Sequence, residues 1–201
     1  MSSPEFKILT DGTLEIYALG TWRLIPGCSC AGVFEYADRM AELAQIIQDA
    51  DASDTIESLY LYDKRFRWLC DRVLELNHCP VEWIRPADLG WLMFGWFADD
   101  GTPQKSALAL LNDPPAPRHP RKPSKGDGPA DFISLLAALA SLPDTSLEEA
   151  LKIATSIPAR QALGVMDDRA WAMLSDEEKE DIKFKAQAEA FRANFGNPTP
   201  G

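Results

Sequence analysis

The sequence predicts an α+β fold that is mostly α-helical, with a small β element at the N-terminus packed on helices. Three observations predict it. Alternating apolar and polar residues are confined to residues 5–25, helical periodicity runs through most of the remainder, and one proline-rich stretch interrupts that periodicity. We therefore expect a β-hairpin or three-stranded element, helices that cover it, a linker and a C-terminal helical segment.

Three short runs at the N-terminus have the alternation of β-strands. They are residues 5–9, 13–18 and 21–25, with a tight-turn signal at Asp11-Gly12 and an end signal at Pro26-Gly27. Strands this short are marginally stable alone, so we expect them to rest on an apolar surface that helices supply.

Helices are expected between the strands and the proline-rich stretch. The first two follow apolar residues at helical spacing, and the last two begin with proline, which suits the first turn of a helix. The expected ranges are 33–50, 54–76, 80–84 and 86–97.

A basic, proline-rich segment divides the chain. Residues 112–130 contain six prolines and two glycines, with four basic residues against two acidic ones. Repeated proline removes backbone donors and prevents helix formation, so we expect an extended linker. It would join an N-terminal α+β domain, residues 1–111, to a C-terminal helical segment, residues 131–197, followed by a tail at 198–201.

The C-terminal segment is expected to form four short helices. The first, from Asp131, is apolar nearly all round, and Pro158 suits the start of the third. Ser146 and Ser175 each precede a glutamate by three residues, which is the spacing of a capping box. A core this small is often marginal, so packing on the first domain or on a partner is expected. One face of the last helix carries Phe184, Ala188, Phe191 and Phe195.

Length and composition narrow the function class. The chain has 201 residues, of which 46% are hydrophobic and 25% charged, as in soluble globular proteins. No stretch reaches the ~18 consecutive apolar residues of a membrane span, and the N-terminus lacks the features of a secretion signal. The net charge of −11 opposes binding to nucleic acid or anionic lipid. We expect a cytoplasmic protein with neither a membrane nor a nucleic acid as partner.

Cysteine and histidine are the first candidates for chemistry. Cys28, Cys30, Cys79 and His78 could in principle supply a tetrahedral zinc site, but their spacing matches no standard zinc motif. The sequence favours reduced, buried thiols instead, with His78 closing a helix. The other histidine, His119, lies in the linker, where we expect nothing to hold it in place.

The sequence contains no recognisable catalytic constellation. The carboxylate pairs Asp99-Asp100 and Asp167-Asp168 lack the surrounding loop of a calcium site, and phosphate-binding, metalloprotease and serine-hydrolase motifs are missing. We therefore expect no cofactor, no metal, no catalytic residue and no enzymatic activity.

Aromatic residues are concentrated between positions 83 and 97. The stretch contains Trp83, Trp91, Phe94, Trp96 and Phe97. On a helix beginning at Pro86, one face would enter the core, while Trp96 and Phe97 would turn partly to another side. Two interpretations stay open: all five build the core over the strands, or part of the set is a partner-binding surface with Trp96 on the outside.

Three stretches resemble the tail assembly chaperones of long-tailed bacteriophages. They are residues 66–76, residues 87–95 and the helix start at Ile157-Pro-Ala-Arg160. The order of a small N-terminal domain, a linker and a helical segment is also similar, and the similarity covers about two-thirds of the chain. The resemblance implies a non-enzymatic adaptor in the host cytoplasm that binds the tape-measure protein and recruits tail-tube subunits during assembly.

Other classes of protein share this composition. A structural virion component, such as a connector or baseplate accessory protein, is the main alternative, ahead of a small metal-dependent enzyme or an acidic inhibitor. A mimic of nucleic acid needs its carboxylates on one face, whereas here they are interleaved with lysine and arginine. The sequence thus predicts a protein that acts through protein–protein contacts.

Overall fold

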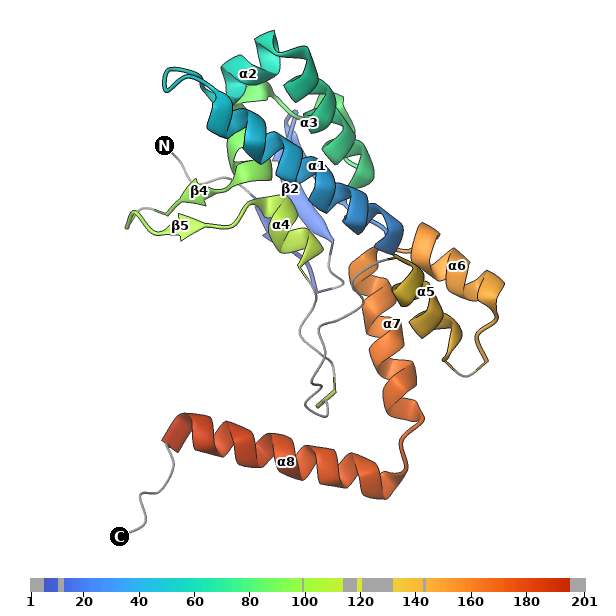
Figure 1. The fold of residues 1–201 in the computed structure, drawn as a ribbon. Coiled ribbons are helices and arrows are strands. Elements are labelled where there is room, and N and C mark those ends of the chain that lie inside the picture. The colour runs from blue at the N-terminus through green and yellow to red at the C-terminus, as the bar shows by residue number, and fades with distance from the viewer. Residues whose placement is uncertain are drawn as a thin grey trace.

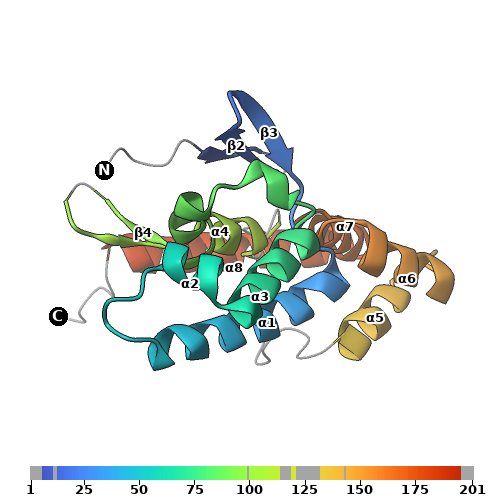
Figure 2. The same ribbon diagram turned by 90° about the horizontal axis from the view of Figure 1, so that it is seen from above.

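The structure, a computed structural model, describes residues 6–10, 13–98, 100–113, 119–120, 132–142 and 144–195, with the backbone alone for Phe132 and residues 191–195. A three-stranded antiparallel sheet lies at the N-terminus and most of the remainder is helical (Figure 1). The predicted α+β, mainly helical fold is confirmed. Seen from above, the sheet is a separate layer that protrudes from the helices (Figure 2).

The sheet has the strand order β1-β2-β3. Its strands are β1 Phe6–Ile8, β2 Leu14–Ala18 and β3 Thr21–Ile25, close to the expected ranges. β2 and β3 pair across a two-residue turn at Leu19 and Gly20, with Tyr17 opposite Trp22. Both turn residues have positive φ, 51° and 78°, as in the type I′ turn that matches the twist of a hairpin.

One face of the sheet builds the N-terminal core, in which Leu14, Ile16 and Ile25 are buried. The other side of this core is formed by α1 Cys30–Asp49, α2 Ile56–Tyr62 and α3 Lys64–Leu76. The two carboxylate oxygens of Glu35 on α1 accept hydrogen bonds from Arg72 on α3, both at 2.8 Å. This bidentate pair fixes how the two helices lie against each other, and it lowers the pKa of Glu35.

The single helix expected over 54–76 is in fact two helices. Asp63 has an extended backbone, with φ −95° and ψ 113°, and separates α2 from α3. Its carboxylate accepts hydrogen bonds from the N–H groups of Arg65 and Phe66, at 2.8 and 3.0 Å. Asp63 therefore acts as the N-cap of α3, and this local bonding competes with a continuous helix.

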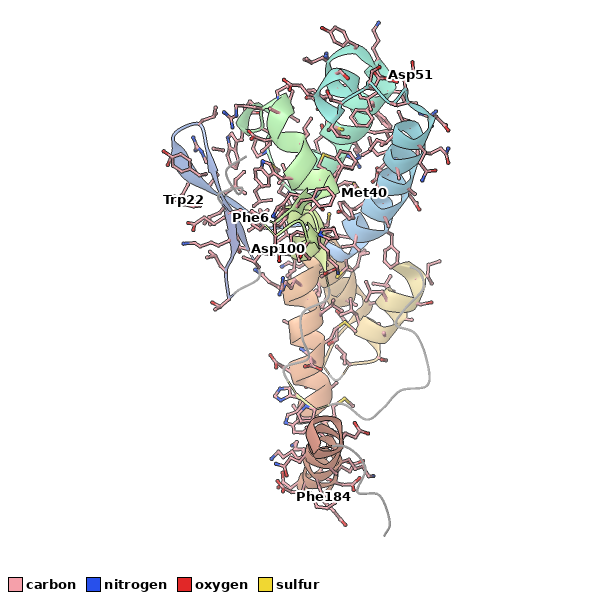
Figure 3. All side chains as sticks on the ribbon, turned by 90° about the vertical axis from the view of Figure 1, so that its left-hand side faces the viewer. Phe6, Trp22, Met40, Asp51, Asp100 and Phe184 are labelled. Carbon is pink, nitrogen blue, oxygen red and sulfur yellow. The ribbon has the colours of Figure 1, made fainter. Side chains whose placement is uncertain are left out.

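Residues 81–112 form the middle layer, between the sheet and helices α1–α3 (Figure 3). The continuous helix expected over 86–97 is wrong: Gly90 and Gly95 weaken it, and the chain forms short turns instead. Gly95, at φ 105°, closes the π turn, and an added Cβ there would lie 2.5 Å from the carbonyl oxygen of Gln104. The unexpected helix α4 is only six residues long. The elements are η1 Val81–Trp83, η2 Pro86–Asp88, η3 Gly90–Phe94, β4 Trp96–Phe97, β5 Pro103–Gln104 and α4 Ala107–Asn112.

The four expected C-terminal helices are present. Ser146 and Ser175 accept hydrogen bonds from the N–H groups of Glu149 and Glu178, at 3.1 and 3.2 Å, as their spacing predicts. Figure 1 shows α8 extending away from the other helices. The side chain of Phe184 on α8 is exposed. The side chains of Phe191 and Phe195 lie outside the described residues. The helices are α5 Phe132–Ala140, α6 Leu147–Ser156, α7 Ala159–Ala172 and α8 Asp176–Phe195.

The C-terminal helices dock on the first turns of α1. A second hydrophobic cluster combines buried residues of α5, α6 and α7 with Cys30, and Val33 and Phe34 of α1 pack against it. Beside this cluster the N–H of Ala159 donates to the carbonyl oxygen of Cys28 at 2.7 Å. Packing on the first domain, one of the two expected arrangements, thus completes the small C-terminal core. Most of the predicted linker and the whole tail at 198–201 lie outside the described residues.

Candidate functional site

The aromatic segment, which we define as residues 81–97, packs mainly inward. Trp83, Trp91 and Phe94 are partly buried against the N-terminal core. Phe94 stacks on the fully buried ring of Phe66, with the ring centroids 6.0 Å apart. Three of the five predicted partner-binding residues therefore also support the core.

Phe6 of β1 connects the aromatic segment to the sheet. Figure 3 shows Phe6 on the helix side of the strands. Its ring is parallel to that of Trp91 at 5.7 Å and meets Trp96 edge-on at 5.1 Å. Trp96, expected on the outside, is therefore half-buried, whereas Phe97 is 75% exposed. A partner-binding role for these residues stays a prediction, and Phe97 is the member that a partner can reach most easily.

A second apolar surface covers the water side of the sheet. Figure 3 shows Trp22 pointing away from the helices. An antiparallel sheet with one covered face normally presents polar residues to water on the other, so a row of large apolar residues there indicates a contact surface. We call the following four residues the outer sheet face: Tyr17, 48% exposed, Leu19, 64%, Trp22, 48%, and Leu24, 54%.

Contacts within the outer sheet face keep its side chains in place. The rings of Tyr17 and Trp22 meet edge-on with centroids 5.5 Å apart. The Lys7 ammonium lies 5.5 Å from the centroid of the Trp22 ring and forms an ion pair with Glu15 at 2.7 Å. Rings held in this way lose little conformational freedom when they bind a partner.

Leu19 occupies a backbone conformation that is costly for its side chain. Its φ of 51° lies in the left-handed region, which bulky residues rarely adopt, and asparagine or glycine is usual at this turn position. The leucine gains no burial in return, because its side chain is mostly exposed. An exposed leucine in such a strained conformation is consistent with a role in contact with another molecule.

The outer sheet face was not among the residues predicted from the sequence, although strand alternation carries a signal for it. In the run 21–25, Trp22 and Leu24 fall on one face and Ile25 on the other. Both faces of β3 therefore bear large apolar residues. Whichever face enters the core, the other leaves apolar side chains in water.

The cysteines are buried thiols. Burial raises the pKa of Cys28, Cys70 and Cys79 to about 12 and that of Cys30 to about 11. Thiols with such pKa values are protonated at neutral pH, whereas a metal ligand or a nucleophile must be a thiolate. Within the described ranges, no group of three or more His, Cys, Asp or Glu side chains is arranged to hold a metal ion.

His78 closes helix α3, as its position in the sequence indicates. It has a left-handed backbone, with φ 55°, at the place where glycine usually ends a helix. Its N–H donates to the carbonyl of Glu75 and that of Cys79 donates to Leu74, both at 2.9 Å, which is the pattern of a Schellman motif. His78 and Cys79 thus have a structural role at this helix end.

The expectation that nothing holds His119 is wrong. Its ring is parallel to that of Trp171 on α7, with centroids 4.8 Å apart, and its Nε2 lies 3.1 Å from Oδ1 of Asp168. Its backbone N–H donates to Asp167 at 3.2 Å. The acidic pair on α7 therefore binds this point of the proline-rich segment, a contact between residues 49 positions apart that local sequence patterns do not encode.

A cleft of about 500 Å³ lies beside this contact, lined by residues of α5, α7 and α8. Most of its lining is apolar and includes Leu142, Met166 and Leu174. Two ionisable residues, His119 and Asp167, line it in the described part of the chain. The carboxylate of Asp167 accepts from the backbone N–H of His119, and the His119 ring contacts Asp168. Both side chains thus have partners within the protein, and the rest of the described lining offers few polar groups to orient a reacting substrate.

No helix in the described ranges combines the length and the apolar character needed to cross a membrane. The chain matches no protein-family model, no curated protein and no solved structure.

Proposed function

We propose that this chain is a non-enzymatic protein-binding adaptor and that the outer sheet face is its docking surface. The observation that carries this proposal is the exposure of Tyr17, Trp22 and Leu24 on a sheet whose other face already covers the core. Aromatic side chains dominate the binding energy of many protein interfaces, and these rings are held in place before binding.

Tail assembly is the process in which we propose that the adaptor acts. The order of a sheet-bearing domain, a proline-rich segment and a helical segment resembles that of tail assembly chaperones. The implied partners are the tape-measure and tail-tube proteins, met in the host cytoplasm. Exposed apolar residues on two separate parts of the chain, the outer sheet face and Phe184 of α8, support binding to two partners.

Capture of the native partner tests the proposal. The immobilised full chain is incubated with a lysate of the cells that naturally make it, and the retained proteins are identified by mass spectrometry. Trp22→Thr should reduce the retained partner about tenfold or more, because it removes the central ring of the surface. Its matched control is Tyr62→Thr, which removes an aromatic ring that is exposed on α2 away from the sheet.

Two outcomes would contradict the proposal. Equal capture by wild type and Trp22→Thr would exclude the outer sheet face as the docking surface. Recovery of the chain from purified virus particles would favour the alternative function, a structural virion component.

A further inference from the structure

The free edge of β3 adds a second binding element to the outer sheet face. Among the described strands β3 pairs with β2 alone. Ala18 and Thr21 flank the two-residue turn and form a hydrogen-bonded pair, so bonded and non-bonded pairs alternate from there. The N–H and C=O groups of Trp22 and Leu24 consequently point away from β2. An edge of this kind is a template for a further strand.

Arg23 lies between these two residues and carries a charge that the described residues do not neutralise. Its side chain is on the inner side of β3, with the guanidinium over the ring of Trp83 at 5.1 Å. Its Nε is buried without a hydrogen-bond partner, and no acidic side chain of the described ranges forms an ion pair with it. Because a partly buried cation is most stable beside an anion, this position favours an incoming carboxylate.

We infer that an extended segment of the partner protein adds to β3 as a strand and places an Asp or Glu opposite Arg23. This inference rests on the proposed function and specifies the partner segment as apolar, acidic and apolar at three consecutive positions. The two apolar residues lie opposite Trp22 and Leu24 and continue the outer sheet face. The acid lies on the inner side, in the closely spaced non-hydrogen-bonded position opposite Arg23.

The same geometry disfavours a second copy of this chain as the occupant. Antiparallel pairing of two β3 strands over their full length centres on Arg23 and sets two guanidinium groups directly opposite each other. A charge on the inward face of an edge strand generally discourages unwanted pairing. Arg23 therefore disfavours pairing with the β3 strand of a second copy and favours a strand that carries an acidic residue.

Three synthetic heptapeptides test the preference for an acidic residue opposite Arg23. Each has threonine pairs at both ends and a centre of Val-Glu-Val, Val-Gln-Val or Val-Lys-Val, and its binding to the full chain is measured by fluorescence anisotropy. The Glu peptide should bind about fivefold or more tightly than the Lys peptide. The Arg23→Glu variant should reverse that order. Equal affinities for the three peptides, or an order that Arg23→Glu leaves unchanged, would overturn the inference.

Removal of backbone donors tests strand addition itself. N-methylation of both valines of the Glu peptide eliminates the N–H groups that face β3 and should abolish its binding. On the protein, Leu24→Pro removes one edge donor that does not belong to the β2–β3 ladder, and Leu24→Thr, which keeps the donor, is its matched control. Undiminished binding of the N-methylated peptide would overturn the inference even if Leu24→Pro does not fold.

Native-partner capture separates this inference from the proposed function. Loss of capture in Trp22→Thr together with full capture in Leu24→Pro and Arg23→Glu would retain the docking surface and overturn strand addition. Loss of capture in all three folded variants would support both. Dimerisation of the chain in sedimentation, if Leu24→Pro abolishes it, would identify a second copy as the occupant and overturn the inference.

Discussion

The aromatic segment and the outer sheet face lie on opposite sides of the same three strands and differ in exposure. Four of the five aromatic residues predicted in the segment are at least partly buried, and its contacts run to Phe6, Phe66 and Arg23. The outer sheet face has only two aromatic rings, Tyr17 and Trp22, and both are about half exposed. The comparison teaches that aromatic density along a sequence does not show which aromatic side chains are exposed.

The largest expected effect concerns the aromatic segment, whose side chains are mostly covered. Phe94→Ala should lower the free energy of unfolding by about 3 kcal/mol, because its ring stacks on the buried Phe66. Phe97→Ala is the matched control: it removes the same type of ring from an exposed position and should cost about 0.5 kcal/mol or less. Urea denaturation of the two variants measures both values. Equal losses would remove the distinction between the covered and the exposed part of the aromatic segment.

The thiols of the core under the aromatic segment should make stability depend on alkaline pH. Burial raises the pKa of Cys70 and Cys79 from 9.0 to about 12. The folded state then holds these protons more tightly than the unfolded state, so the stabilisation is complete below pH 9 and is lost as the pH rises toward 12. We expect a loss of about 1 kcal/mol per thiol between about pH 8 and pH 10.

Denaturation of wild type and Cys70→Ala at both pH values checks this. Between these pH values the free energy of unfolding of Cys70→Ala should fall by about 1 kcal/mol less than that of wild type, because the variant lacks one of the buried thiols. An identical pH dependence in the two proteins would mean that the Cys70 thiol is accessible to solvent.

The smallest effect concerns Leu19 of the outer sheet face, where a substitution should increase the free energy of unfolding instead of lowering it. Leu19→Asn should raise the free energy of unfolding by about 0.5 kcal/mol, because asparagine tolerates the left-handed conformation of the type I′ turn better than leucine. The same variant should capture less of the native partner, since it removes an exposed apolar residue of the outer sheet face. A gain in stability without any loss of capture would assign Leu19 to the turn alone.

Structural elements that depend on residues close together in the sequence could be predicted from the sequence alone. The three strands, the end of α3 at His78 and the caps at Ser146 and Ser175 depend on residues within a few positions of one another. The division at Asp63 was not predicted, because a side-chain cap and a continuous helix compete there and tertiary packing decides between them. Gly90 and Gly95 are visible in the expected helix at 86–97, but the sequence alone does not show that they reduce it to short turns.

The candidate site was harder to predict than the fold. Alternation in β3 shows that one of its faces stays apolar in water, yet it does not show which face. The stack of His119 on Trp171 and the contact of Arg23 with Trp83 join residues that are far apart in the sequence. No periodicity or cap reports on contacts of this kind.

By itself, the sequence determined the class of fold, the position of the strands and of most helices, and the lack of a recognisable catalytic motif. These features follow from the steric preferences and the polarity pattern of a few neighbouring residues, which are properties of the local sequence and do not depend on the rest of the fold. Only the tertiary structure decided that Trp96 is covered and Trp22 is not, because exposure depends on what other layers place above a side chain. Phe6 covers Trp96, whereas the outer side of β3 faces water, and that difference selects the surface proposed to bind a partner.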